Sequence, residues 1–220
     1  MVCDVDGRRP EQKKIAKILD WPMPRTMKEA HGFIGLCVYY RIFVKDFSTI
    51  VLPILLLFRK NVVFLWTVDC QTAMDWLKEL LTMTPILVSL EFLATAGLIV
   101  LSVDASLTGW GAILQQVQPD GSLKPARYES GIWTGSELNY DAVKLECRGL
   151  LKALKKLRYW LFGRFFLVET DAQTLVWLLN QPPNDLPNTM LTRWLAYIRL
   201  FDFDVKHVKG LQNSGPDALS

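Results

Sequence analysis

The stretch Leu98–Gln116, LIVLSVDASLTGWGAILQQ, combines an apolar strand pattern with a carboxylate at the end of the strand. Side chains alternate between the two faces of a β-strand, so Val100, Ser102 and Asp104 are expected on one face. A carboxylate that ends a buried strand is costly unless it is paired or binds a cation. Asp104 is therefore the first candidate functional residue.

The sequence on both sides of Asp104 predicts an α/β fold. The segments Leu98–Asp104, Gly109–Gln116 and Lys124–Trp133 are separated by the short turn sequences SLTG and PDGS, which predicts an antiparallel meander. A long helix is expected over 136–162, with Ser136 as its N-cap. Further downstream we expect a strand in RFFLVETDA, helices in QTLVWLLN and NTMLTRWLAYIRLF, and a strand in FDVKHVKG. The predicted order is βββαβααβ, followed by the start of a C-terminal helix.

Residues 1–92 have helical periodicity instead. Helices are predicted in PEQKKIAKILDW, in MKEAHGFIGLCVYYRIFVKDF and in TVDCQTAMDWLKELLTM, where Thr67 or Asp69 would be the N-cap. The change from helical to strand periodicity predicts a boundary between about Thr84 and Gly97. We therefore expect two units, a mainly helical one over 1–92 and an α/β one over 96–220.

Two more acids interrupt apolar patterns in the α/β part. Asp171 closes the strand in RFFLVETDA, as Asp104 closes the first strand. The right-handed βαβ rule favours a parallel arrangement of strands bridged by a long helix, which would bring both aspartates to one edge of the sheet. On that helix, Glu146 stands where the apolar stripe through Leu150 and Leu157 requires an apolar residue.

Together these carboxylates predict a metal site. Three carboxylates that are forced together repel one another unless a divalent cation neutralises them, and ligands that are all oxygen suit Mg²⁺ or Mn²⁺. Asp217, in NSGPDALS, is a candidate fourth ligand at the first turn of the terminal helix.

Taken singly, each acid also has a structural explanation. Asp104 and Asp171 could be turn or capping residues, and Glu146 could be a structural glutamate paired with Arg148 or Lys144. The fourth acid could be a helix N-terminal residue that the helix dipole favours. Four independent caps would not be expected to converge on one sheet edge, which favours the metal site.

Composition narrows the function classes. The formal net charge of +3 neither requires nor excludes a polyanionic partner. Two histidines and four dispersed cysteines give little support to a zinc site or a Ser-His-Asp hydrolase. No signal-peptide pattern or membrane segment is evident, so an intracellular setting is expected. Basic residues of the helical part are candidates for nucleic-acid contacts, with a solvated helix face as the alternative for each: Lys13, Lys14, Lys17, Arg25, Lys28, Arg41 and Lys45.

Four motifs together resemble a known family. VDASLTGWGAIL, LECRGLLKALKKLRYWLFG, VETDAQTLVWLLNQ and HVKGLQNSGPDALS, in this order, resemble the ribonuclease H domain of gypsy-type LTR retrotransposon polyproteins. Upstream, DGRRPEQKKIAKILDWPMPRTMKEAHGFIGLCVYYRIFVKDFS and FLWTVDCQTAMDWLKELLTMTPIL look like the thumb and connecting segment of their reverse transcriptase.

The resemblance implies an RNase H-like fold that hydrolyses the RNA strand of RNA/DNA hybrids with two divalent ions, Mg²⁺ or Mn²⁺. By motif, the four metal-binding acids of the family correspond to Asp104, Glu146, Asp171 and Asp217. The implied partners are the hybrid and the remainder of the reverse transcriptase polyprotein, and the implied location is cytoplasmic, within retrotransposon particles. No palm segment is recognised, so polymerisation is not expected. Cellular ribonucleases H carry a histidine before the last acid, whereas His207 lies earlier here.

Two other functions stay open. A catalytically silent, co-opted RNase H-like module would keep the fold and bind nucleic acid or another partner without turnover. An integrase- or resolvase-like nuclease has less support, because Glu146 lies on the helix between the two strand aspartates rather than near the C-terminus. Cleavage of a labelled hybrid with and without chelator separates the first alternative from the enzyme.

Overall fold

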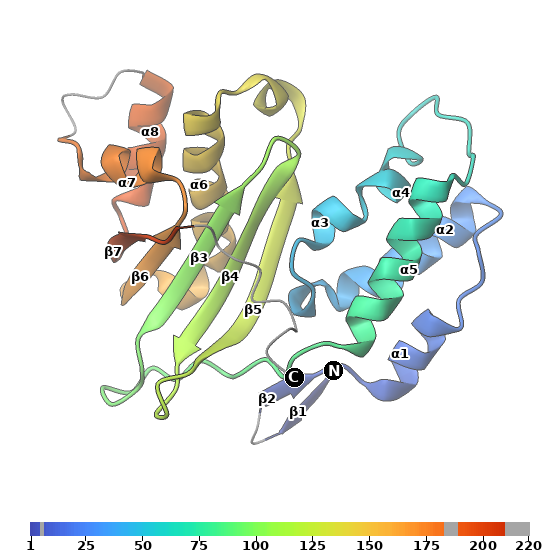
Figure 1. Cartoon of the computed structure of the whole chain (residues 1–220), viewed down its shortest axis with the longest axis horizontal. Coiled ribbons are helices and arrows are strands. Elements are labelled where there is room, and N and C mark those ends of the chain that lie inside the picture. Colours follow the sequence, from blue (N-terminus) through green and yellow to red (C-terminus); the bar gives the residue numbers. More distant parts are fainter. Residues whose placement is uncertain (5–6, 183–188, 210–220) are drawn as a thin grey trace.

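A five-stranded mixed sheet forms the centre of the downstream half of the molecule (Figure 1). The computed structural model describes residues 1–4, 7–182 and 189–209. The strand order is β5-β4-β3-β6-β7, and the strands are β3 (Ile99–Ala105), β4 (Gly109–Val117), β5 (Leu123–Ile132), β6 (Phe165–Thr170) and β7 (Asp202–His207). Strands β3, β4 and β5 are antiparallel neighbours, whereas β6 runs parallel to both β3 and β7. The predicted α/β class, the meander and the parallel β3–β6 pair are confirmed.

Helix α6 (Ala142–Leu161) covers one face of the sheet. The strand residues Leu101 and Val103 belong to the same buried cluster as Leu150 and Leu157 of α6. Helices α7 (Gln173–Asn180) and α8 (Thr189–Ile198) pack beside α6 (Figure 1). Alternation along the strands thus leaves the opposite face of β3, which carries Ser102 and Asp104, outside this core.

The start of α6 differs from the prediction. A separate 3-10 helix, η2 (Gly135–Asn139), precedes α6 and has a capping box between Thr134 and Glu137. The N-cap of α6 is Asp141, whose Oδ1 accepts a hydrogen bond of 2.9 Å from the backbone N–H of Lys144. Ser136 is therefore not the N-cap of α6. It lies inside the separate 3-10 turn η2, which the Thr134–Glu137 capping box begins.

The upstream part, residues 1–92, is here called the helical half. Its elements are β1 (Val2–Asp4), β2 (Gly7–Arg9), α1 (Gln12–Leu19), α2 (Met27–Tyr39), η1 (Arg41–Phe43), α3 (Phe47–Ile50), α4 (Leu52–Leu56) and α5 (Val68–Thr82). Thr67 caps α5 by accepting a hydrogen bond from the backbone N–H of Cys70, which settles the choice between Thr67 and Asp69. The β1–β2 hairpin was not predicted, because its strands are only three residues long.

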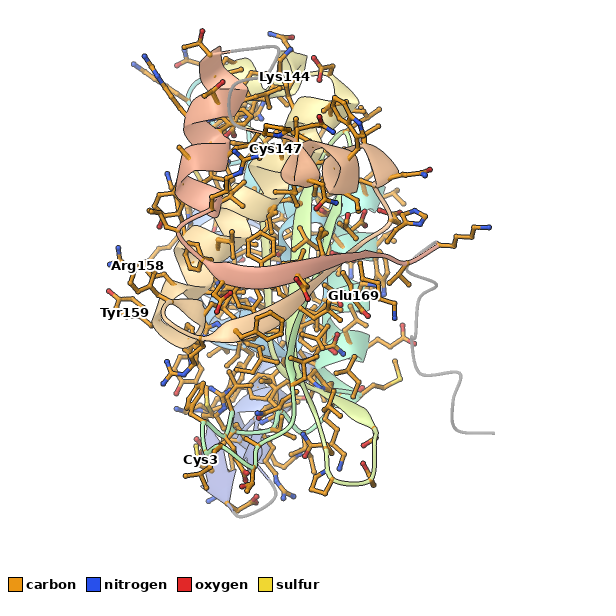
Figure 2. The ribbon with its side chains drawn as sticks, turned by 90° about the vertical axis from the view of Figure 1, so that its left-hand side faces the viewer. Cys3, Lys144, Cys147, Arg158, Tyr159 and Glu169 are labelled. Carbon is orange, nitrogen blue, oxygen red and sulfur yellow. The ribbon has the colours of Figure 1, made fainter. Side chains whose placement is uncertain are left out.

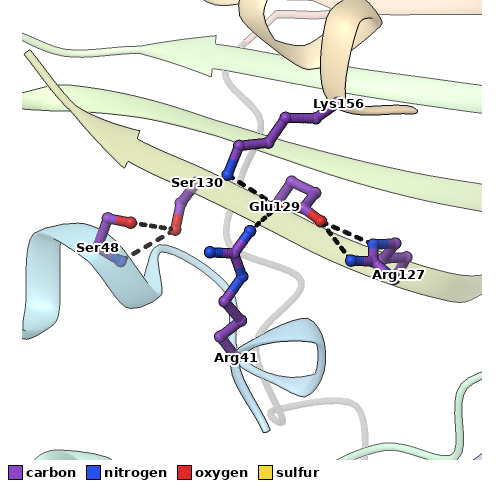
Figure 3. A network of polar contacts seen from close by, with 6 residues as sticks. All are labelled: Arg41, Ser48, Arg127, Glu129, Ser130 and Lys156. Atoms are coloured by element: carbon purple, nitrogen blue, oxygen red, sulfur yellow. Dashed lines mark hydrogen bonds and ion pairs between the residues drawn. The ribbon is translucent and has the colours of Figure 1, made fainter. Parts of the chain in front are cut away.

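The helical half has its own buried core and packs along the edge strand β5 (Figure 1). Glu129 of β5 is the centre of this interface (Figure 3), with a side chain that is only 2% exposed. Its carboxylate is 2.7 Å from Arg41 of η1, 2.7 Å from Arg127 and 3.3 Å from Lys156 of α6. Burial alone would raise the pKa of Glu129, but the three cations outweigh it and hold the pKa below its ordinary value.

The predicted domain boundary between about Thr84 and Gly97 stays a prediction. The connecting segment is hydrogen-bonded to the sheet, since Gln116 Nε2 donates to the backbone oxygens of Glu91 and Gly97 at 2.8 and 2.9 Å. No helix in the described parts of the chain is both long enough and apolar enough to cross a membrane.

Replacing Glu129 by Gln should destabilise the protein strongly. Arg41, Arg127 and Lys156 would then face one another without a counter-charge. Because these three cations are partly exposed, the loss should lie between the about 1 kcal/mol of an exposed pair and the about 3–5 kcal/mol of a fully buried one. Denaturant unfolding measures this loss. The control is Asp4→Asn, which breaks the exposed Asp4–Arg9 pair and should cost less than about 1 kcal/mol. Equal losses for the two variants would contradict the central place of Glu129.

Candidate functional site

The ends of β3 and β6 bring Asp104 and Asp171 together. Ser102 pairs with Glu169 in the parallel β3–β6 register, and the two aspartates stand two residues further along each strand. Asp104 is the penultimate residue of β3 and Asp171 directly follows β6. Both side chains are exposed at this edge. Partial burial, followed by repulsion from Asp171, raises the pKa of Asp104.

Glu146 reaches the same edge from the second turn of α6. Its Oε2 atom is buried and has no hydrogen-bond partner within the described residues. The two cations considered for pairing are engaged elsewhere, since Arg148 Nε donates to Glu137 at 2.8 Å and Lys144 pairs with Asp141. The alternative that Glu146 is a paired structural glutamate is therefore wrong.

Glu146 is coupled electrostatically to the two aspartates. Burial, followed by repulsion from Asp171 and Asp104, raises the pKa of Glu146 to about 8. Burial is also the largest cause of the raised pKa of Asp104, followed by Asp171, while Lys45 acts in the opposite direction. At neutral pH the Glu146 carboxyl therefore keeps its proton, mainly because it is buried and secondly because Asp171 and Asp104 repel its charge.

Whether these acids hold a metal ion stays a prediction. In the described residues, no three His, Cys, Asp or Glu side chains form a group that could hold a metal ion as they stand. Asp217, the predicted fourth ligand, lies outside the described residues. The donor set nevertheless fits a hard divalent cation, because it consists of carboxylate oxygens and one of them is buried without a partner.

Several polar groups beside the acids were not predicted. Figure 2, seen from the β7 side, shows Glu169 on β6, and its Oε2 lies 3.5 Å from Ser102 Oγ of β3. Ser102 Oγ also donates to Gln115 of β4 at 3.1 Å. His207 ends β7, and its Nε2 lies 3.0 Å from the backbone oxygen of Asp171. The parallel β6–β7 register, which pairs Thr170 with His207, could have indicated this last contact.

The basic residues predicted to contact nucleic acid do not form one group. Arg41 pairs with the buried Glu129, a structural role that the sequence did not reveal. Lys45 is half-buried near Asp104. The remaining five are exposed on the helical half: Lys13, Lys14, Lys17, Arg25 and Lys28.

Comparison with known proteins shows which family the downstream half resembles. Residues 96–201 match the family described as the RNase H-like domain found in reverse transcriptase. The retrovirus-related Pol polyprotein from transposon 297 of Drosophila melanogaster is 33% identical over 220 residues, which are 98% of this chain and 19% of the relative. The transposon Tf2-3 polyprotein of Schizosaccharomyces pombe is 31% identical over 97% of this chain and 16% of the relative. The chain therefore spans less than a fifth of these relatives.

Solved structures share the fold. The foamy viral protease-reverse transcriptase in complex with an RNA/DNA hybrid has a TM-score of 0.74 and 22% identity, covering 100% of this chain and 31% of that chain. The same protein in complex with dsDNA has a TM-score of 0.75 and 22% identity, covering 95% of this chain and 44% of that chain. The resemblance read from the sequence motifs is confirmed.

The raised pKa of Glu146 predicts a pH-dependent stability without metal. Between the ordinary value of 4.5 and about 8, the folded protein keeps a proton that the unfolded chain has lost, so stability falls as pH rises through this window. Glu146→Gln cannot ionise and should lose this part of the pH dependence. At about pH 8 the Glu146→Gln protein should therefore melt at a higher temperature than the unmodified chain. For a chain of this size, each kcal/mol of added stability raises the melting temperature by about 2–4 °C.

Thermal unfolding in chelator over this pH range measures the effect. The matched control is Glu79→Gln, at an exposed position on α5. A Glu146→Gln protein that melts with the same pH dependence as the control would show that Glu146 is not held in a repulsive site.

Proposed function

Because residues 96–201 belong to the family of RNase H-like domains found in reverse transcriptase, we propose that this chain hydrolyses the RNA strand of RNA/DNA hybrids. The reaction is endonucleolytic and depends on two divalent ions, Mg²⁺ or Mn²⁺. The electrostatic coupling of Glu146 to Asp171 and Asp104, together with the unpartnered buried oxygen on Glu146, is the observation that carries the proposal.

The donor chemistry fits these ions. Asp104 and Asp171 would hold them from the strand ends and Glu146 from the helix, with Asp217 as the proposed fourth ligand. Bound divalent ions supply an activated water as nucleophile and stabilise the leaving 3′-oxygen. Glu146 must lose its proton to act as a ligand, so cation binding and deprotonation of this carboxyl are coupled.

The chain's other residues keep the acids in place. Helix α6 is fixed by its buried apolar stripe, and its N-cap Asp141 lies five residues before Glu146. The contact between His207 Nε2 and the backbone oxygen of Asp171 holds the end of β6 beside β7. Rigid positioning matters because metal ligands must keep their geometry while the substrate binds.

The setting is part of the proposal. The polyprotein relatives support a chain that works as one part of a reverse transcriptase, with the hybrid and the remainder of the polyprotein as partners. The foamy viral protein bound to an RNA/DNA hybrid supports the substrate class. A cytoplasmic location, within retrotransposon particles, follows from the same relationship.

Asp171→Asn should abolish cleavage of a hybrid whose RNA strand is labelled. Losing one metal-binding carboxylate removes several kcal/mol of transition-state stabilisation, so a rate loss of at least about 100-fold is expected in Mg²⁺ or Mn²⁺. Asp202→Asn is the matched control, because Asp202 begins β7 at the opposite end of the sheet. Its rate should equal that of the unmodified chain.

The outcomes separate the functions. Chelator-sensitive cleavage of the hybrid, but not of single-stranded RNA, supports the nuclease. An unmodified chain that binds the hybrid and never cleaves it supports the silent binding module instead. Full activity of Asp171→Asn would overturn the assignment of the acids.

A further inference from the structure

A turn of the helical half lies over the acidic edge of the sheet. Asp104 of β3 pairs with Gly111 of β4, and Gly111 pairs with Ser130 of β5. Directly opposed residues on neighbouring strands share a face, so these three positions form a row across the sheet. Asp46 of the helical half lies above Gly111, where any Cβ would overlap with Asp46 Oδ1. The glycine thus leaves room for a residue from a distant part of the chain.

The turn that carries Asp46 is anchored on both sides. Before it, Arg41 of η1 donates from Nη2 to Glu129 Oε2 at 2.7 Å (Figure 3). After it, Ser130 Oγ accepts a hydrogen bond of 2.9 Å from the backbone N–H of Ser48. Both partners belong to β5, so the turn is held against the sheet rather than projecting into solvent.

The anchored turn brings a lysine to the acids. Lys45 and Asp46 line one small cavity together with Asp104 and Gly111. The cavity measures about 20 Å³, which is room for about one water molecule. Lys45 lowers the pKa values of both Asp46 and Asp104, which are raised mainly by burial, so its ammonium group acts on both carboxylates.

We propose that Lys45 is a substrate-positioning residue of the nuclease site, and that its ammonium group binds a phosphate of the hybrid beside Asp104. The helical half is then a working part of the site and not only a connection to the polyprotein. This inference rests on the proposed function and deepens it. A cation is useful at this place because the acids repel the phosphate backbone that the site has to bind.

The rest of the turn has a supporting role. Asp46 has a left-handed backbone conformation, with φ 53°, which aspartate tolerates better than most residues. Its αL conformation redirects the chain between η1 and α3, so that Lys45 lies at the sheet and Ser48 at β5. Lys45 could in principle serve only as a counter-charge for these carboxylates. A phosphate contact and a counter-charge differ in how they affect the salt dependence of binding.

Hybrid binding by Lys45→Ala distinguishes the two roles. Binding is measured in the Asp171→Asn background with Mg²⁺, over a series of salt concentrations. A lysine that contacts a phosphate contributes about one unit to the slope of log K against log salt, and its loss weakens binding uniformly. We expect the slope to fall by about one unit and the dissociation constant to rise about three- to tenfold at near-physiological salt. Lys45→Arg should restore both.

Two comparisons complete the experiment. Lys60→Ala removes an equal charge from an exposed position after α4 and should change the slope less than Lys45→Ala. Gly111→Ala should displace Asp46 and the turn that carries Lys45. If it weakens hybrid binding through Lys45, the double variant with Lys45→Ala should bind only slightly more weakly than Lys45→Ala alone. A Lys45→Ala slope equal to that of Lys60→Ala would overturn the inference while leaving the nuclease proposal intact. An unmodified chain that neither binds nor cleaves the hybrid would contradict the proposed function itself.

Discussion

Repulsion among Asp104, Glu146 and Asp171 is the constraint on which the candidate site depends. Each carboxylate comes from a different element: β3, α6 or the end of β6. Burial first, and repulsion from Asp171 and Asp104 second, raise the pKa of Glu146 to about 8, and one of its oxygens is buried without a partner in the described residues. A fold that stores repulsion in this way is stabilised by any ligand that brings positive charge to the edge. A divalent cation and a neighbouring lysine would both bring positive charge to these carboxylates.

The interface with the helical half supplies the second source of positive charge. Glu129 is a buried anion that gathers Arg41, Arg127 and Lys156, and it binds a cation from each part of the molecule. Specific pairing of this kind fixes how two packed units are oriented more strictly than apolar contact alone. Because the anchored segment continues into the turn at Lys45, the orientation of the helical half and the electrostatics of the site are coupled.

Sequence patterns predicted the elements whose signals are local. Strand alternation and the interrupted helix stripe singled out Asp104, Glu146 and Asp171, whose role as metal ligands stays a prediction, and the motif resemblance to retrotransposon reverse transcriptases is confirmed. Contacts between distant parts of the chain were missed, since no local pattern links Arg41 to Glu129 or Asp46 to Gly111. The start of α6 was misplaced because the local Thr134–Glu137 capping box forms a separate 3-10 turn that contains Ser136, which leaves Asp141 to cap α6.

The most direct test of the account is the titration of the Glu146 carboxyl by NMR with and without saturating Mg²⁺. Without the ion, the account predicts a pKa near 8, raised by burial and by the two aspartates. With the ion bound among the three carboxylates, the pKa should fall below its ordinary value of 4.5, because the cation favours the ionised form. A Glu146 pKa that stays near 8 at saturating Mg²⁺ would contradict the claim that these acids form a cation site.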